Sequence, residues 1–371
     1  MELSTASRRV VVAGWSGTTN LGDELALRAL LSLLDEQGLT ATVVSRDPAT
    51  TATQHGVESL ALGDVAGLWR ALGDAAGLVL GPGTILQDQT SPVSLPWHLS
   101  RVLTTAAARR PVVGVGLGIG PLRRPGSHAL VGAGLRRCAA VAVRDPASAA
   151  LAAGCGVRGV LVGCDLALAL PRPTGTITPR LVAALRAHAP GLGWRPLQDR
   201  PAAAWDPTRV TGLAAALDEA AERTGLALCL VAMDTDHDAA YATAVADRLR
   251  SPHEIVVPGL DDALEVVGTA EVVVAMRYHA GIAALAGGRP TVLVDYADKV
   301  RSLADDIAAS GGAGGVLRVA DDPGGWAGLG TAVAAVQGQG EAVERARHRI
   351  VERLSAPRRA IEVLDEARRA A

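Results

Sequence analysis

The chain has 371 residues, of which 49% are hydrophobic, and it contains 42 glycines but no phenylalanine. This length suggests two domains, each able to bury a core, because a domain usually takes roughly 100–200 residues. The formal net charge of −2 and the lack of a concentrated basic stretch argue against a nucleic-acid-binding protein. The four cysteines show no Cys-x-x-Cys spacing, so neither a zinc motif nor a redox motif is expected.

The N-terminal sequence lacks the layout of a signal peptide, because its apolar run VVVAG is short. No uninterrupted apolar stretch reaches the roughly 18 residues typical of a transmembrane helix. From the sequence we therefore expect a cytoplasmic protein.

Short apolar runs alternate with helical patterns in the first half of the chain. Leu27, Leu30, Leu31 and Leu34 recur at the spacing of one helix face. The apolar runs are continuous, which is typical of strands in a parallel sheet covered on both faces. Such strands are predicted at residues 9–14, 42–44, 78–80, 111–116, 139–144 and 160–163.

A proline-rich stretch at residues 171–179 separates the two halves and is predicted to be a linker. The alternation then resumes, with strands predicted at residues 226–231, 254–257, 271–275 and 290–294. A charged helical tail follows at residues 341–371, interrupted at Pro357. We therefore predict an α/β protein with two Rossmann-like parallel-sheet domains, at residues 1–172 and 173–371. The C-terminal helix could pack back on the first domain.

Ligands of open parallel sheets bind beyond the carboxyl ends of the strands. Glycine-rich turns stand there at residues 14–24, 81–88 and 116–121. The first turn has neither the Gly-x-Gly-x-x-Gly of dinucleotide sites nor the Gly-Lys-Ser/Thr of a P-loop. Its Asn20 or Asp23 could cap the next helix, and both side chains are also good partners for sugar hydroxyls.

A second signal lies in residues 276–280, where an apolar strand gives way to a helix of small residues. A helix N-terminus favours an anion, and Arg277 adds bidentate recognition of a phosphate or carboxylate. His279 could exchange a proton near neutral pH. The alternative is an arginine paired with a local carboxylate and a histidine in the core. Lys299, after the next predicted strand, favours the anion pocket.

The acidic residues 234–238 (DTDHD) resemble a solvated turn that opens a helix more than a metal cluster. We therefore predict no metal site.

Taken together, these strings resemble the polysaccharide pyruvyl transferase family. The matching pieces occur in the family's order at residues 17–24 (GTTNLGDE), 81–88 (GPGTILQD), 116–121 (GLGIGP), 143–148 (VRDPAS), 276–280 (MRYHA) and 296–300 (YADKV). The resemblance implies a GT-B-like fold with the active site between two Rossmann-like domains. It also implies transfer of a pyruvyl group from phosphoenolpyruvate to a saccharide, which forms a cyclic pyruvate ketal and releases phosphate.

The resemblance assigns roles to the donor-site residues. As a hypothesis of our own, we expect the acceptor on the first domain and the donor on the second. The residues expected to bind the donor are Arg144, Arg277, Lys299 and, on a shorter match, Arg195. The residues expected to bind the acceptor are Asn20, Asp23, Gln87 and Asp88. Catalysis is expected from His279 and Arg277. No cofactor is expected beyond phosphoenolpyruvate as co-substrate.

The expected acceptor is a lipid-linked cell-wall or exopolysaccharide precursor, and the enzyme could then sit at the inner face of the cell membrane. The oligomeric state is open. Two alternatives also stay open. One is a GT-B nucleotide-sugar glycosyltransferase, in which Asp261 or Glu265 would bind the ribose. The other is a non-catalytic sugar-binding relative.

Overall fold

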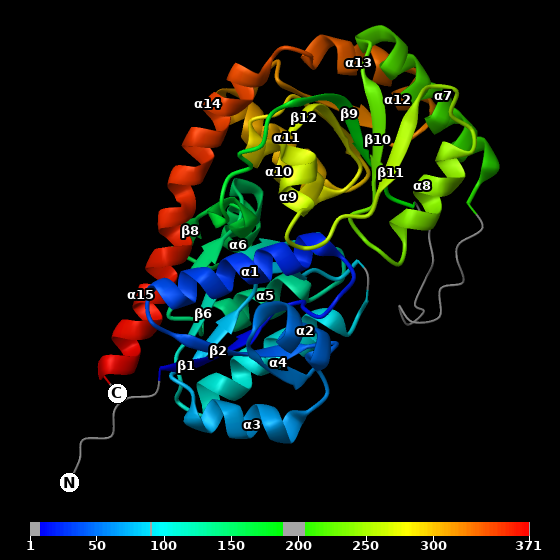
Figure 1. Cartoon of the computed structure of the whole chain (residues 1–371). Coiled ribbons are helices and arrows are strands. Elements are labelled where there is room, and N and C mark those ends of the chain that lie inside the picture. The colour runs from blue at the N-terminus through cyan, green and yellow to red at the C-terminus, as the bar shows by residue number, and fades with distance from the viewer. Residues whose placement is uncertain (1–7, 90, 188–204, 371) are drawn as a thin grey trace. The chain divides into compact units, whose positions relative to one another are not determined.

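The computed structural model describes residues 8–89, 91–187 and 205–370, which form two α/β units (Figure 1). The first unit comprises Met1–Thr18, Asp23–Leu170 and Val351–Ala371. The second comprises Thr19–Gly22 and Pro171–Ile350. The division falls after Leu170 rather than after residue 172, and the chain returns to the first unit for its last residues.

The first unit is built on an eight-stranded sheet in the order β3-β2-β1-β4-β6-β7-β8, with β5 paired to β6. All of these pairings are parallel. The strands are β1 (Arg9–Ala13), β2 (Thr40–Ser45), β3 (Glu58–Ala61), β4 (Leu78–Leu80), β5 (Gly83–Leu86), β6 (Val112–Ile119), β7 (Ala140–Val143) and β8 (Leu161–Val162). The helices are α1 (Leu21–Glu36), α2 (Pro48–His55), α3 (Val65–Asp74), α4 (Ser94–Ala107), α5 (Ser127–Leu135), α6 (Pro146–Gly154), the 3₁₀ helices η1 (Leu166–Ala169) and η4 (Glu352–Leu354), and α15 (Ser355–Ala370).

Both faces of this first sheet are covered. Helices α3 to α6 share a core with Val11 and Leu78 on one face. Helices α1 and α15 share a core with Val12 and Val79 on the other. Because successive strand residues point to opposite faces, two covered faces require the continuous apolar runs seen in the sequence.

The second unit has a six-stranded parallel sheet in the order β11-β10-β9-β12-β13-β14. The strands are β9 (Thr178–Ala184), β10 (Ala227–Val231), β11 (His253–Val256), β12 (Ala270–Ala275), β13 (Thr291–Asp295) and β14 (Val316–Ala320). The helices are α7 (Pro207–Thr224), α8 (Asp238–Ala246), α9 (Ala263–Gly268), α10 (Tyr278–Gly287), α11 (Asp298–Ile307), the π-helix η3 (Ala308–Gly312), α12 (Pro323–Ala327), α13 (Leu329–Val336) and α14 (Gly340–Val351). Numbered from β9, the order is 3-2-1-4-5-6, so the winding direction reverses between β9 and β12. Ligands of such sheets bind at this switch point.

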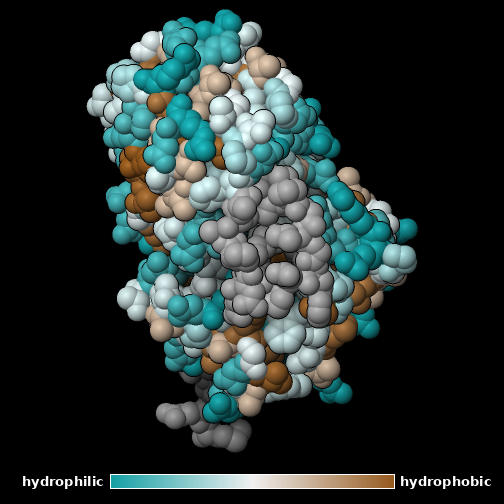
Figure 2. Space-filling view, turned by 90° about the vertical axis from the view of Figure 1, so that its right-hand side faces the viewer, coloured by the Kyte–Doolittle hydropathy of each residue, from teal (hydrophilic) through white to brown (hydrophobic). Residues whose placement is uncertain are grey.

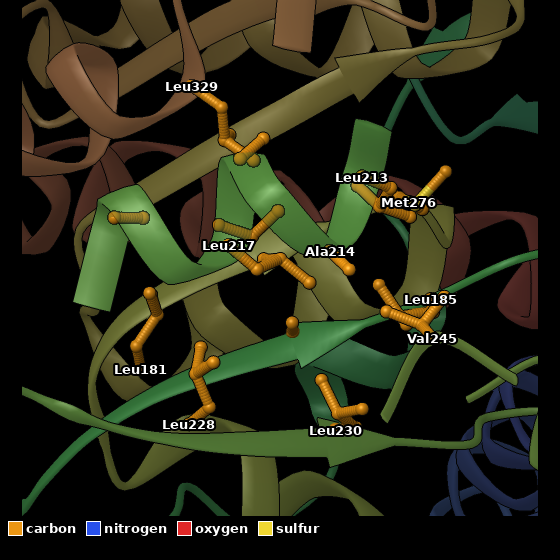
Figure 3. Packing of buried hydrophobic residues seen from close by; sticks show 14 of the residues in the cluster. Leu181, Leu185, Leu213, Ala214, Leu217, Leu228, Leu230, Val245, Met276 and Leu329 are labelled. Carbon is orange, nitrogen blue, oxygen red and sulfur yellow. The ribbon is translucent and has the colours of Figure 1, made fainter. Parts of the chain in front are cut away.

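Helix α7 anchors one layer of the second unit. Its Leu213 and Leu217 lie against the leucines of β9 and β10, among them Leu181, Leu228 and Leu230 (Figure 3). Helices α8 and α13 contribute to the same buried cluster. This packing fixes the strands whose carboxyl ends carry the candidate site.

Every strand predicted from the sequence is present, and the two parallel-sheet domains are confirmed. Strands β3, β5, β9 and β14 were not predicted. The expected linker at residues 171–179 is wrong at its end, because β9 begins at Thr178. The helical tail is broken at η4, whereas Pro357 lies in the first turn of α15, where proline is tolerated.

On the face drawn in Figure 2, brown apolar groups lie among teal polar ones. Among the helices of residues 8–89, 91–187 and 205–370, none is both long and apolar enough to span a bilayer.

Candidate functional site

Four neighbouring strands of the second sheet end next to polar side chains. Arg186 follows β9, Asp234 follows β10, Arg277 follows β12, and Tyr296 follows β13. Because parallel strands end at one edge, these residues gather at the carboxyl edge, around the switch point between β9 and β12. We call this group, together with Asp238, Tyr278, His279 and Lys299, the switch-point cluster.

Arg277 is held in the cluster by two carboxylates. Its Nε donates to Asp238 Oδ2 at 2.8 Å, and its Nη2 donates to Asp238 Oδ1 and, at 3.2 Å, to Asp234 Oδ2. Asp238 is fully buried. Burial by itself lowers the pKa of Arg277, but the two carboxylates outweigh it and raise the pKa, so the guanidinium stays charged. The prediction of a solvated turn at residues 234–238 is therefore wrong for both aspartates, which bury their carboxylates against this arginine.

Asp234 also holds the short segment Thr19–Gly22, which belongs to the second unit. Thr19 Oγ1 donates to Asp234 Oδ1 at 2.9 Å, and Leu21 N donates to the Met233 carbonyl at 2.9 Å. One carboxylate thus connects this segment with the guanidinium of Arg277.

His279 stands in the first turn of α10, a helix whose residues are all buried. Its ring meets the Tyr278 ring edge-on, with centroids 5.1 Å apart. A Cβ atom at Gly22 would lie 2.0 Å from His279 Nδ1, so only a glycine leaves room for this imidazole. The segment Thr19–Gly22 therefore determines where His279 can stand.

Two positively charged side chains lie close to the ring of Tyr296. The guanidinium carbon of Arg186 lies 4.4 Å from the Tyr296 ring centroid, and Lys299 Nζ lies 5.9 Å from it. Lys299 Nζ is also 5.8 Å from the Tyr278 ring. Burial alone raises the pKa of the Tyr296 phenol, but the charges of Lys299, Arg186 and Arg277 outweigh it and lower the pKa. The cluster can therefore hold an anion.

The loop before α1 is shaped by its own polar groups. Asn20 Oδ1 accepts from Gly22 N at 3.2 Å, as a helix-capping residue does. The buried Glu24 accepts from Thr18 N at 2.9 Å and meets His55 Nε2 at 3.0 Å. Gly17 has a φ of 70°, which favours glycine. Asn20 and Glu24 thus hold the conformation of this loop, while Asp23 is half-buried in the first turn of α1.

The structure gives Asp88 a role within the first unit. Its buried carboxylate accepts hydrogen bonds from Arg123 N, Arg124 N and Ser127 Oγ at 2.7–2.9 Å. Burial raises the pKa of this carboxyl, but the hydrogen bonds from the loop outweigh it and lower the pKa. Asp88 thus holds the loop before α5 in place. The neighbouring Gln87 is half-buried and accepts from Gln89 N.

Arg144 lies in the first unit, directly after β7. Its Nε donates to Asp145 Oδ2 at 3.0 Å, and Asp145 in turn caps α6. The guanidinium passes close to Gly118, where a Cβ atom would lie 2.9 Å from the guanidinium carbon. Arg144 is therefore held at the carboxyl edge of the first sheet, whereas Arg277, His279 and Lys299 belong to the second unit.

Two residues singled out from the sequence, Arg195 and Glu265, are not part of the switch-point cluster as described. Arg195 lies outside the described residues. Glu265, the candidate ribose ligand of a nucleotide-sugar enzyme, accepts hydrogen bonds from Thr174 N and Gly175 N. Among the described residues, no group of three or more histidines, cysteines or acidic residues is arranged to hold a metal ion.

Reasoning from the sequence missed Arg186, Tyr296, Asp234 and Asp238 as members of the cluster. Arg186 follows the apolar run LVAAL, and that run was the available signal for β9. Asp234 and Asp238 could have been found from two features of the sequence. A buried Arg277 requires a carboxylate partner, and an acidic turn directly follows β10.

The profile of the family described as polysaccharide pyruvyl transferase matches residues 20–298, which is most of the chain. The chain belongs to the polysaccharide pyruvyl transferase family. The match begins at Asn20 and includes the switch-point cluster from Arg186 to Tyr296, and Lys299 follows directly after its end. No curated protein matches the sequence.

Solved structures show the same fold at low identity. A putative UDP-N-acetylglucosamine 2-epimerase from Listeria monocytogenes is 12% identical, with a TM-score of 0.58 over 91% of this chain and 90% of that one. The UDP-GlcNAc 2-epimerase from Methanocaldococcus jannaschii is 12% identical, with a TM-score of 0.56 over 94% and 99%. The spinosyn rhamnosyltransferase SpnG is 13% identical, with a TM-score of 0.58 over 96% and 99%. The GT-B-like fold class is thereby confirmed.

Proposed function

We propose that this transferase moves a pyruvyl group from phosphoenolpyruvate to a saccharide, forming a cyclic ketal and releasing phosphate. The observation that supports this most is the switch-point cluster, where Arg277, His279 and Lys299 gather at one edge of the second sheet. Family membership supports the transfer of a pyruvyl group. The donor and the product are our inference.

Phosphoenolpyruvate places a phosphate and a carboxylate on one small frame. Such an anion loses its hydration shell only where cations replace it. Lys299 and Arg277 supply positive charge, and Asp234 and Asp238 keep the Arg277 fork in one orientation. Because those aspartates occupy Nε and Nη2, we assign Nη1 of Arg277 to the donor. Arg144 and Arg195 stay candidates for donor binding.

The reaction needs a proton at the methylene carbon of the donor. We assign its delivery to His279, because histidine is the side chain that most often serves in general acid–base catalysis. Protonation makes the adjacent carbon electrophilic, and a sugar hydroxyl adds to it and gives up its proton. Phosphate then leaves with the electrons of its C–O bond, and a second hydroxyl of the same sugar closes the ketal and releases a proton. No step here uses a cofactor.

The acceptor is proposed to be a saccharide, such as a lipid-linked cell-wall or exopolysaccharide precursor. Asp23 and Gln87 are our candidates for binding its hydroxyls, since both are half-buried at the carboxyl edge of the first sheet. Asn20 stays a weaker candidate, because its side-chain oxygen already caps α1.

Phosphate release from phosphoenolpyruvate, measured across a panel of free and lipid-linked saccharides, tests the proposal. The expected product shows the methyl signal of a ketal. His279→Ala should slow release by about 10²–10⁴-fold, the usual contribution of general acid–base catalysis. The exposed His253, on β11 of the same unit, provides the control variant His253→Ala, which should keep full activity.

Turnover of UDP-sugars in place of phosphoenolpyruvate would contradict the proposal and favour a glycosyltransferase. Saccharide binding without any turnover would favour a non-catalytic relative.

A further inference from the structure

Arg186 differs from Arg180 and Arg277, two other arginines of the second unit, in the groups that contact its guanidinium. It is half-buried and stacks on the Tyr296 ring, and burial lowers the pKa of its guanidinium. Within the described part of the chain, no carboxylate lies within ion-pair distance of Arg186. Arg277 pairs with Asp238, and Arg180, at the start of β9, pairs with Glu254 at 3.1 Å. Arg186 is therefore a partly desolvated cation that forms no direct ion pair among the described residues, although Asp238 and Asp321 attract its charge from a greater distance.

Arg186 stands beside the switch point of the sheet, where its charge can contact a bound ligand. It follows β9, the strand on one side of the switch point, whereas Arg277 follows β12 on the other side. Stacking on Tyr296 holds the planar guanidinium and leaves its edge, with five N–H donors, to meet an anion. Lys299 approaches the same tyrosine ring. Arg186 and Lys299 thus both lie close to the ring of Tyr296.

We propose that Arg186, together with Lys299 and supported by Tyr296, forms the subsite for the phosphate group of the substrate. This inference rests on the proposed function and refines it. Arg277 has two of its nitrogens committed to carboxylates. The more highly charged end of the donor is better matched by Arg186, whose fork can bind two phosphate oxygens at once.

Binding of inorganic phosphate, phosphoenolpyruvate and pyruvate to the full-length protein, measured by calorimetry, tests the subsite. Arg186→Gln should weaken phosphate and phosphoenolpyruvate binding about tenfold or more, because a charged hydrogen-bonding partner is lost. Arg186→Lys should recover part of the affinity. Pyruvate, which lacks the phosphate, should bind Arg186→Gln and the unaltered protein alike.

Two variants of Tyr296 test whether its aromatic ring is needed to hold Arg186 and Lys299 for phosphate binding. Tyr296→Phe keeps the ring and should retain phosphate binding, whereas Tyr296→Leu removes the ring and should weaken it. The control is Arg180→Gln, at the opposite end of β9, which should bind phosphate like the unaltered protein. Thermal unfolding of each variant checks that the fold is kept.

Unchanged phosphate affinity in Arg186→Gln, or no phosphate binding by the unaltered protein, overturns the subsite. Loss of pyruvate binding with phosphate binding kept overturns it too, because Arg186 would then serve the carboxylate. Loss of phosphate binding in Arg186→Gln, in a protein that turns over no phosphoenolpyruvate, supports the subsite and refutes the proposed donor.

Discussion

The absence of a side chain at Gly22 sets the position of the candidate catalytic imidazole. His279 Nδ1 occupies the space that a Cβ atom of residue 22 would need. Asn20 caps the helix at the same place, so the backbone of this turn is fixed. The turn GTTNLGDE thus serves the chemistry through its shape as well as through its polar groups.

Gly22→Ala tests this steric role. We expect the variant to lose about 1–3 kcal/mol of unfolding free energy, as overpacked sites do, and to release phosphate more slowly because the imidazole is displaced. The matched control is Gly73→Ala in α3, where a Cβ atom meets nothing within 4 Å. That change should stabilise the protein slightly, because alanine favours a helix. Equal activity in the two variants would refute the role of Gly22.

We expect the buried His98 to make the stability of the protein depend on pH. This histidine is 1% exposed, and burial, aided by the positive charge of Arg101, lowers its pKa from 6.5 to about 4. The unfolded chain therefore binds the proton at a higher pH than the folded chain does. Below pH 6.5 the free energy of unfolding should fall, by at most about 3 kcal/mol near pH 4.

The measurement compares urea unfolding at pH 7 and pH 4.5. His98→Gln should lose less stability on acidification than the unaltered protein, whereas substitution of the exposed His253 should leave the dependence as it was. An unaltered dependence in His98→Gln would show that other groups cause the acid effect.

Single residues were predictable where their chemistry is local. Arg277, His279 and Lys299 stand directly after apolar strands, and the structure brings them to the switch point. The carboxylates that hold Arg277 lie 39 and 43 residues before it in the chain. No local pattern reports such a pairing, because it depends on which strands become neighbours.

At the scale of elements, β9 shows why a strand is missed. Its Thr178 and Pro179 continue a proline-rich stretch, and proline argues against a central strand. Yet β9 lies between β10 and β12. Proline is accepted because it stands near the start of the strand, and the apolar residues Leu181–Ala184 form the buried part. Because β9 was not predicted, Arg186, which follows it, was not recognised as a residue at the carboxyl edge of the sheet.

Helix α15 offers a test of how a distant element completes a core. Its Ala360, Ile361 and Leu364 are buried in the first unit with residues of α1 and the sheet. Ile361→Ala should lower the unfolding free energy by about 2–5 kcal/mol, because it opens a cavity. Glu366→Ala, on the exposed face of the same helix, should change it by less than about 0.5 kcal/mol. Similar values for the two variants would contradict this packing.

For the whole molecule, repeated alternation of strands and helices predicted two parallel-sheet domains, since only covered sheets need such strands. The sequence also shows that the tail is an amphipathic helix. It does not show which sheet the apolar stripe covers, because both sheets have similar surfaces of valine, leucine and alanine. That choice is made by tertiary packing.

The return of the chain to the first unit has a consequence for biosynthesis. Residues 171–350 leave the ribosome before α15 does. At about 5–20 residues per second, the nascent first unit waits roughly 10–40 s for its last helix. During that interval the surface later covered by Ile361 and Leu364 is open to water, and a chaperone that shields apolar surface would find its target there.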